Sequence, residues 1–228
     1  MLSGSQPMSG FTAARQKMVD GQVRPSDVTD IRILDAMLAV PREAFVPGNK
    51  QALAYLDLDL DVSEGGSAGR FLIQPAVLAK MLQAAEIKET DRVLVVGCAT
   101  GYAAAVIAGF ASQVTATESD PALAATARDL LARNGCEKVA VRTAAAADGD
   151  PADGPFDVVV LNGATEVVPE RLYGQLRDGG RLVGVFATSQ PARATIVTCS
   201  HGDFGHRTLF DAAAPVLPGM ERVRAFVF

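Results

Sequence analysis

From residue 92 onward the chain alternates short apolar runs with longer runs of helical periodicity. We predict strands at 92–97, 113–119, 139–144, 156–162 and 181–187, and helices at 102–111, 120–135 and 169–180. The helix at 120–135 has aspartate at its capping position, proline in its first turn and glycine after its end. Strands as apolar as these are typical of a parallel sheet covered on both faces, so the pattern predicts a doubly wound α/β fold.

The two ends of the chain break this alternation. Near the C-terminus, 192–199 and 206–211 have the pattern of an antiparallel hairpin with a glycine-containing turn, and a last strand is predicted at 222–228. For the N-terminal part we predict helices at 11–24, 29–40 and 75–87, with an irregular segment at 48–73. Thr29 and Asp30 supply capping side chains for the second of these helices, and Pro75 suits the first turn of the third.

These elements indicate a flexible N-terminal tail at 1–10 followed by a single domain at 11–228. Within that domain, 11–75 forms a helical and irregular elaboration, and 76–228 forms the α/β core. A length of 228 residues suits one α/β domain of this kind, and the sequence has no internal repeat.

Composition narrows the classes of partner. Hydrophobic residues make up 49% of the chain and charged residues 21%, which is enough apolar material for a sizeable core. The net charge of −5 and the pI near 5.1 argue against a nucleic-acid partner, which would need a basic face. The cysteines Cys98, Cys136 and Cys199 have no ligand-like spacing to His201 or His206, so we predict no metal site. Cysteines this far apart fit a reducing compartment, and we expect a cytoplasmic protein.

The stretch from Val93 to Thr117 contains no charged residue, and by its length alone it could cross a bilayer. Gly97, Gly101 and Ser112 interrupt it, and its first half is rich in valine while its second half is rich in alanine. We interpret it as a strand, a turn, a helix and the start of the next strand. The N-terminal sequence MLSGSQPMSGFTAARQK lacks the apolar core of a secretory signal. We therefore expect no membrane partner.

The turn GCATGY at 97–102 is the first candidate for chemistry, because it follows the first strand of the alternating pattern. Ligands of doubly wound sheets bind at such strand-to-helix turns, where glycine permits close approach and the helix start offers free N–H groups. Glu118 lies 21 residues beyond Gly97, at the end of the next predicted strand. A carboxylate in that place can accept hydrogen bonds from both hydroxyls of a ribose, so the spacing predicts a nucleoside-containing ligand.

The turn reads G-x-A-x-G followed by Tyr102, whereas dinucleotide sites read G-x-G-x-x-G. Together with the antiparallel ending of the sheet, this turn resembles that of the class I methyltransferases, which use S-adenosylmethionine as cofactor. The same two features disfavour an NAD-dependent oxidoreductase.

Further segments resemble protein-L-isoaspartate O-methyltransferases in order and in approximate spacing. These segments are MVDGQV (18–23), LDAMLAVPREAFVP (34–47), AYLD (54–57), GCATGYAAAVIA (97–108), PFD (155–157) and VPERLYGQLRDGGRLV (168–183). The resemblance covers residues 11 to about 219 and implies a seven-stranded, mostly parallel sheet with an N-terminal helical elaboration. It also implies methylation of the carboxylate of isoaspartyl residues in damaged proteins. That carboxylate, with a reference pKa of about 3.9, is ionised at neutral pH, so the reaction needs positioning rather than a general base.

The resemblance implies a set of residues around S-adenosylmethionine. They are Gly97, Cys98, Ala99, Gly101, Tyr102, Glu118, Ser119 and Asn162.

The chain also departs from the family pattern. Ile73 stands where the family has a functional serine, and it cannot form a hydrogen bond; its polar neighbour Gln74 is our candidate replacement. Val95 stands where the family usually has an acid, and Ala99 replaces the middle glycine of the turn. The acid that would face the adenine is Asp148 or is absent.

Two functions therefore stay open from the sequence. The first is a methyltransferase that acts on isoaspartyl protein or peptide, or on a diverged substrate. The second is a non-catalytic relative that binds the cofactor or a protein partner. The loop at 57–70 carries the acids Asp57, Asp59, Asp61 and Glu64, which would repel an anionic substrate unless Arg70 offsets them. Nothing in the sequence indicates an oligomeric state.

Overall fold

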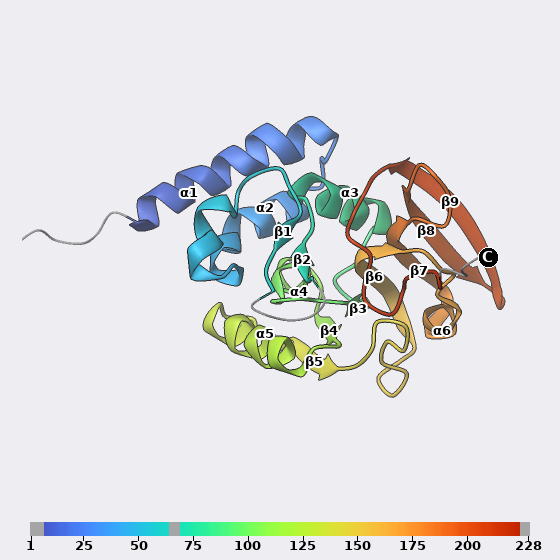
Figure 1. Cartoon of the computed structure of the whole chain (residues 1–228). Coiled ribbons are helices and arrows are strands. Elements are labelled where there is room, and N and C mark those ends of the chain that lie inside the picture. The colour runs from blue at the N-terminus through green and yellow to red at the C-terminus, as the bar shows by residue number, and fades with distance from the viewer. Residues whose placement is uncertain (1–6, 64–68, 224–228) are drawn as a thin grey trace, which may run out of the picture.

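A seven-stranded sheet forms the centre of the computed structural model, which describes residues 7–63 and 69–223. Its strands are β3 (Arg92–Val96), β4 (Gln113–Glu118), β5 (Ala140–Thr143), β6 (Phe156–Thr165), β7 (Leu176–Phe186), β8 (Arg193–Ser200) and β9 (Asp203–Asp211). They lie in the order β5-β4-β3-β6-β7-β8-β9 (Figure 1). Strand β8 pairs antiparallel with both β7 and β9, and all other neighbouring strands pair in parallel. The predicted doubly wound sheet with an antiparallel C-terminal hairpin is confirmed.

The order of the strands places a ligand crevice beside β3. The chain runs outward from β3 to β4 and β5, then returns to the other side of β3 to form β6. Val93 of β3 accordingly pairs with Val114 of β4 and with Val158 of β6. Such a reversal opens a crevice at the carboxyl ends of the two central strands, so the turn that begins at Gly97 lies at this point.

Alternate residues of the central strands pack on opposite faces of the sheet, as the two-residue period of a strand requires. Val93 and Val95 belong to the larger core, which is covered by α3 (Pro75–Ala85), α4 (Tyr102–Ala108) and α5 (Pro121–Arg133). On the other face, Leu94 and Val96 pack with the short helix α6 (Glu170–Tyr173) and with Leu217 near the C-terminus. Both faces are buried, which is the reason that these strands are almost wholly apolar.

The uncharged stretch from Val93 to Thr117 is strand, turn, helix and strand, as predicted. Within the described residues, no helix has both the length and the hydropathy that a membrane crossing would require.

The N-terminal part differs in detail from the predicted helix at 11–24. Helix α1 runs from Pro7 to Met18, so it begins inside the segment that we expected to be a tail at 1–10; residues 1–6 of that segment lie outside the described residues. A π-helical turn at Val19–Val23 and a 3₁₀ turn at Arg24–Ser26 follow. Helix α2 (Ile31–Ala39) then begins after Asp30, whose side chain accepts a hydrogen bond from Arg32 N, which confirms the predicted cap.

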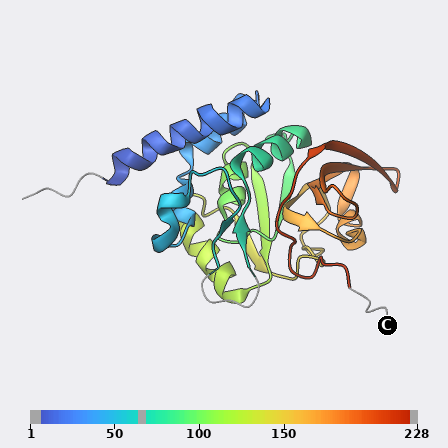
Figure 2. The same ribbon diagram turned by 45° about the horizontal axis from the view of Figure 1, so that its top comes forward.

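The segment at 48–73 is more regular than expected. It follows a 3₁₀ turn at Arg42–Phe45 and contains a second one at Gly48–Leu53. The two short strands β1 (Leu60–Asp61) and β2 (Phe71–Leu72) then pair in antiparallel fashion. In both views of the molecule, α1 extends to the side that lies away from the hairpin of β8 and β9 (Figure 2).

The predicted helix at 169–180 is wrong over most of its length. Only Glu170–Tyr173 is helical, and β7 already begins at Leu176. Gly179 has φ +74°, a left-handed conformation that ends any helix there, and Leu176 pairs with Phe156 before the register of β7 shifts. Gly179 and Gly180 therefore lie in the irregular first part of β7 and do not follow the end of a helix.

The predicted last strand at 222–228 is absent at 222–223, and 224–228 lie outside the described residues. A different C-terminal segment adds to the sheet. Val216 forms a parallel bridge with Ala164 at the end of β6, Ala164 N donates to Pro215 O at 2.8 Å, and Leu217 N donates to Ala164 O at 2.9 Å.

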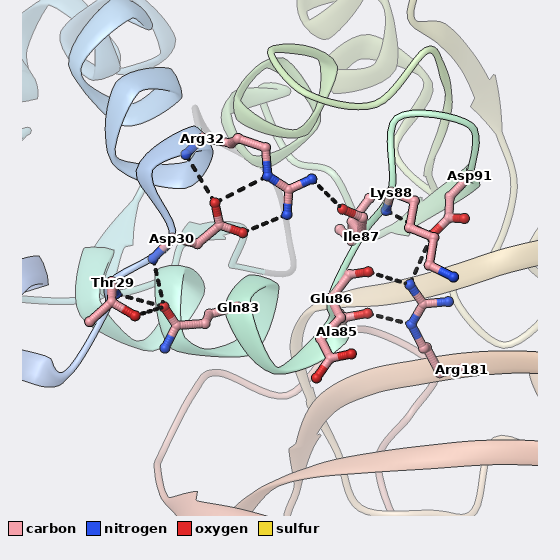
Figure 3. A network of polar contacts seen from close by, with 10 residues as sticks. All are labelled: Thr29, Asp30, Arg32, Gln83, Ala85, Glu86, Ile87, Lys88, Asp91 and Arg181. Carbon is pink, nitrogen blue, oxygen red and sulfur yellow. Dashed lines mark hydrogen bonds and ion pairs between the residues drawn. The ribbon is translucent and has the colours of Figure 1, made fainter.

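A polar network connects the N-terminal helices to the core (Figure 3). The side-chain oxygen of Gln83, on α3, accepts hydrogen bonds from the backbone N–H groups of Thr29 and Asp30 at 2.7 and 3.0 Å. Arg32 pairs with Asp30 at 2.6 Å and also donates to the carbonyl of Ile87 at 2.9 Å. The start of α2 is thus fixed to the end of α3 by side chains.

The second half of this network fixes α3 to the sheet. Arg181 of β7 donates to the carbonyls of Ala85 and Glu86 at the end of α3, and it forms an ion pair with Asp91 at 2.8 Å (Figure 3). Asp91 is nearly fully buried and also accepts from Lys88 N at 3.0 Å. One guanidinium therefore satisfies two helix-terminal carbonyls and one buried carboxylate.

We expect Arg181→Met to lower the free energy of unfolding by about 3 kcal/mol, because it leaves the buried Asp91 carboxylate without its cation. Urea unfolding followed by circular dichroism measures this loss. Arg24→Met is the matched control, because the pair of Arg24 with Asp20 is exposed; its effect should stay within about 0.5 kcal/mol. Equal effects of the two variants would contradict the assignment.

Candidate functional site

The turn after β3 has a backbone conformation that suits glycine. Gly97, Ala99 and Gly101 all have positive φ angles, of +70°, +52° and +99°. Cys98 N donates to Thr117 O at 2.9 Å, which holds the turn against β4. The middle position of the turn therefore places an alanine in the left-handed region, where its Cβ is unfavourable.

Glu118 lies at the end of β4 and is only 1% exposed. Its Oε2 accepts from Ala99 N at 3.0 Å, and its Oε1 accepts from Asp120 N at 3.1 Å. Asp120 in turn caps α5 by accepting from Ala122 N at 2.9 Å and from Leu123 N at 3.2 Å. The sequence spacing thus placed the acid correctly beside the turn.

Arg70 forms a buried ion pair with Glu118. Its Nε lies 2.7 Å from Oε1 of Glu118, its Nη2 lies 2.8 Å from Oγ of Ser119, and the residue is 8% exposed. Arg70 directly precedes β2, so the pair connects the N-terminal elaboration to the end of β4. From the sequence we considered Arg70 only as an offset to the acidic loop, and nothing in its position indicated Glu118 as its partner.

Asn162 connects three parts of the crevice. Its Nδ2 donates to Gly97 O at 2.9 Å and, more weakly, to Phe71 O at 3.4 Å. The buried amide therefore holds β6, the turn and β2 together.

Tyr102, the first residue of α4, is almost fully buried. Its ring packs edge-on against Phe45 at 5.9 Å and under the guanidinium of Arg42 at 4.7 Å. Burial raises the pKa of the Tyr102 hydroxyl. Its side chain thus packs against the N-terminal elaboration, whereas we expected it beside a cofactor.

Ile73 is buried at the edge of the crevice, and its carbonyl accepts a hydrogen bond from Arg42 at 3.0 Å. Gln74 occupies the N-cap position of α3 without a capping hydrogen bond from its side chain, and its backbone N–H donates to Asp59 at 3.0 Å. Burial raises the pKa of Asp59, and the nearby charge of Asp57 acts in the same direction. Glu64 of the acidic loop lies outside the described residues.

Leu217 fills the space above the turn. A Cβ built on Gly97 would lie 2.4 Å from Cδ2 of Leu217, and one on Gly163 would lie 2.9 Å from the same atom. Gly97 and Leu217 enclose a crevice together with Arg70 and Asn162. The free volume of this crevice is only about 10 Å³. That volume is close to one water molecule, whereas sites for small molecules measure roughly 300–1,000 Å³.

A larger space of about 280 Å³ lies beside the crevice, and Arg70 borders both spaces. Phe45, Leu123 and Leu130 make its walls mostly apolar.

The remaining candidate residues lie away from the crevice. Asp148 forms an ion pair with Arg171, and its side chain is half exposed. His201 and His206 lie exposed on the C-terminal hairpin, as predicted. Val95 is buried in β3 between Ala116 and Val160. Within the described ranges no group of His, Cys, Asp and Glu side chains is placed to hold a metal ion.

We expect Ala99→Gly to raise the free energy of unfolding by about 1 kcal/mol, because it removes a Cβ from a left-handed residue. Urea unfolding measures the change. Ala105→Gly in the middle of α4 is the control and should lower stability by about 1 kcal/mol. A destabilised Ala99→Gly variant would show that the methyl group contributes packing that outweighs the backbone cost.

Cys98 is not expected to act as a nucleophile, because burial raises the pKa of its thiol. Iodoacetamide should label Cys136, which is half-buried, in the native protein, and labelling should increase between pH 8 and pH 9 as its thiolate forms. Cys98 should stay unlabelled at both pH values and react only in urea. Peptide mass spectrometry distinguishes the sites, and rapid native labelling of Cys98 would refute its burial.

Comparisons with known proteins agree with this geometry. Residues 13–198 match the family described as protein-L-isoaspartate(D-aspartate) O-methyltransferase. The chain is 37% identical over 182 residues to the protein-L-isoaspartate O-methyltransferase of Koribacter versatilis (strain Ellin345), with 80% of each chain covered. It is 40% identical over 179 residues to that of Methylorubrum extorquens (strain PA1), which covers 78% of this chain and 76% of the relative.

Solved structures show the same fold. A protein-L-isoaspartate O-methyltransferase superposes with a TM-score of 0.80 and 24% identity, over 90% of this chain and 66% of that longer chain. A Plasmodium falciparum protein described by the same name, solved with S-adenosyl-L-homocysteine, superposes with a TM-score of 0.74 and 17% identity, over 91% of this chain and 97% of that one. With its sheet order, its turn at Gly97 and these matches, the chain belongs to the protein-L-isoaspartate(D-aspartate) O-methyltransferase family.

Proposed function

We propose that this protein is an S-adenosylmethionine-dependent protein carboxyl O-methyltransferase that acts on isoaspartyl residues. The observation that carries the proposal is the buried carboxylate of Glu118, which lies at the end of β4 and contacts the turn after β3 in a chain of this family. A carboxylate at this point of a doubly wound sheet is suited to the hydroxyls of a ribose.

The chemistry of the crevice fits the nucleoside part of the cofactor. Glu118 would hold the ribose, while the turn at Gly97 and Gly101 and the start of α4 would lie against the rest of the molecule. When bound, S-adenosylmethionine supplies an electrophilic methyl group. Ser119 and Asn162 stay in the proposed set of contacts, and Cys98 and Tyr102 contribute their backbone atoms, because their side chains are buried in the core.

The protein must then orient an acceptor carboxylate, which is already ionised at neutral pH. We propose that Ile73 stands in the place of the family's serine, so a hydroxyl at this position is not available to hold the substrate. Gln74 is the nearest polar side chain in sequence, and the backbone bond to Asp59 fixes its position. Because burial raises the pKa of Asp59, its negative charge is lost at a higher pH than that of an ordinary aspartate, and that loss would weaken its repulsion of an anionic substrate.

The second candidate is a non-catalytic relative, and two observations favour it. An apolar side chain occupies position 73, and the crevice above Gly97 has room for about one water molecule.

Transfer of labelled methyl from S-adenosylmethionine to an isoaspartyl peptide tests the first candidate. We expect label on the isoaspartyl peptide and background counts on the matched aspartyl peptide. Glu118→Gln, which keeps the shape of the side chain but removes its charge, should reduce transfer at least tenfold, in line with about 1.5–3 kcal/mol for a hydrogen bond to a charged group. Arg92→Gln, at the opposite end of β3, is the control and should keep wild-type transfer.

Absence of transfer from folded wild-type protein would reject isoaspartyl methylation. Equal transfer to both peptides would instead show a carboxyl methyltransferase with a different specificity.

A further inference from the structure

We propose that this chain keeps its own cofactor crevice closed, with Arg70 on the ribose-binding acid and Leu217 above the turn, so that cofactor binding requires both to be displaced. This inference rests on the proposed function, because it concerns the same crevice. It names two residues, one directly before β2 and one in the C-terminal segment, that set the affinity for the cofactor.

The first step concerns the acceptor sites of Glu118. Each carboxylate oxygen offers two lone-pair positions. Oε1 accepts from Arg70 Nε at 2.7 Å, from Asp120 N at 3.1 Å and, more weakly, from Ser119 Oγ at 3.4 Å, so both of its positions are in use. Oε2 accepts from Ala99 N at 3.0 Å and retains one position. Two ribose hydroxyls need two positions, and among the described donors to Oε1 the short contact from a side chain is that of Arg70, because the Ser119 hydroxyl lies 3.4 Å away.

The second step concerns the stability of that contact. Arg70 is 8% exposed, and its Nη2 also donates to Ser119 Oγ at 2.8 Å. An ion pair between groups this deeply buried is screened little by water, so the closed arrangement is the favoured one in the absence of ligand. A ribose must therefore compete with a charged partner for Glu118.

The third step concerns the space above Gly97. Leu217 is 5% exposed, and it is held there by backbone bonds, with Leu217 N donating to Ala164 O and Ala164 N donating to Pro215 O. Its side chain lies so close to Gly97 that a Cβ there would be 2.4 Å away. The remaining volume of about 10 Å³ cannot hold a molecule the size of S-adenosylmethionine.

These steps give a specific expectation for binding. Removal of either side chain should raise the affinity, because the cofactor no longer has to displace it. If Arg70 and Leu217 instead contacted the bound cofactor, their removal would lower the affinity. An increase in affinity therefore indicates that they close the crevice, and a decrease indicates that they bind the cofactor.

We would measure the Kd of S-adenosyl-L-homocysteine by isothermal titration calorimetry for the wild type, Arg70→Ala and Leu217→Ala. Each variant is expected to bind at least tenfold more tightly than the wild type. Arg92→Ala and Leu176→Ala are the controls: Arg92 pairs with Asp153 away from the crevice, and Leu176 is 7% exposed at the start of β7. Both should bind as the wild type does. Glu118→Gln added to Arg70→Ala should abolish the gain.

Hydrogen exchange of the wild-type protein gives a second measurement that needs no variant to fold. Saturating S-adenosyl-L-homocysteine should lower the protection of the amides of Leu217 and Ala164, because displacement of the segment opens the bonds from Leu217 N to Ala164 O and from Ala164 N to Pro215 O. The amides within β3 should keep their protection. Unchanged or increased protection at Leu217 in the saturated protein would overturn the displacement.

The outcomes separate this inference from the proposed function. If the wild type binds as tightly as Arg70→Ala and Leu217→Ala, the closure is refuted while the cofactor site stands. If none of the folded proteins binds S-adenosyl-L-homocysteine, both the closure and the proposed function are refuted.

Discussion

The arrangement of the crevice depends on one buried carboxylate, that of Glu118. Its oxygens accept hydrogen bonds from the turn after β3, from the start of α5 and from Arg70 before β2. A charge in this position without such donors would carry a large desolvation penalty. The left-handed turn, the direction of α5 and the position of the N-terminal elaboration are therefore coupled through a single side chain.

A second buried charge supports the other wall of the same crevice. Arg42 lies over the ring of Tyr102 and donates to the carbonyls of Ala54 and Ile73. The apolar segment that contains Ile73 thus obtains its position from a guanidinium in the N-terminal elaboration. Arg42 and Arg70 thus fix both walls of the crevice from outside the α/β core. This explains how a chain of this family can change the side chains of its crevice without loss of the fold.

The sequence was sufficient to predict those elements of the structure that depend on the local pattern of residues. Apolar strands, a proline-started α3 and the aspartate caps of α2 and α5 all formed as predicted. The helix expected at 169–180 failed because Gly179 adopts a left-handed conformation and the residues around it join a strand, which is a tertiary preference. Glu118 could be found from its spacing to Gly97. Its partner Arg70 could not, because they are 48 residues apart and meet only when the sheet is assembled.

Leu217 gave no periodic signal at all, since it lies in an irregular segment whose place is fixed by two backbone bonds to β6. Its contact with Gly97 joins residues that are 120 positions apart, so the contact can form only after Leu217 has left the ribosome. Until the C-terminal segment has been synthesised, the apolar surface of β3 and β6 that it covers is exposed to solvent. Synthesis of the segment that carries Pro215 and Leu217 is therefore also the event that covers this part of the core, and a product shortened before Pro215 would leave the ribosome with that surface open to aggregation.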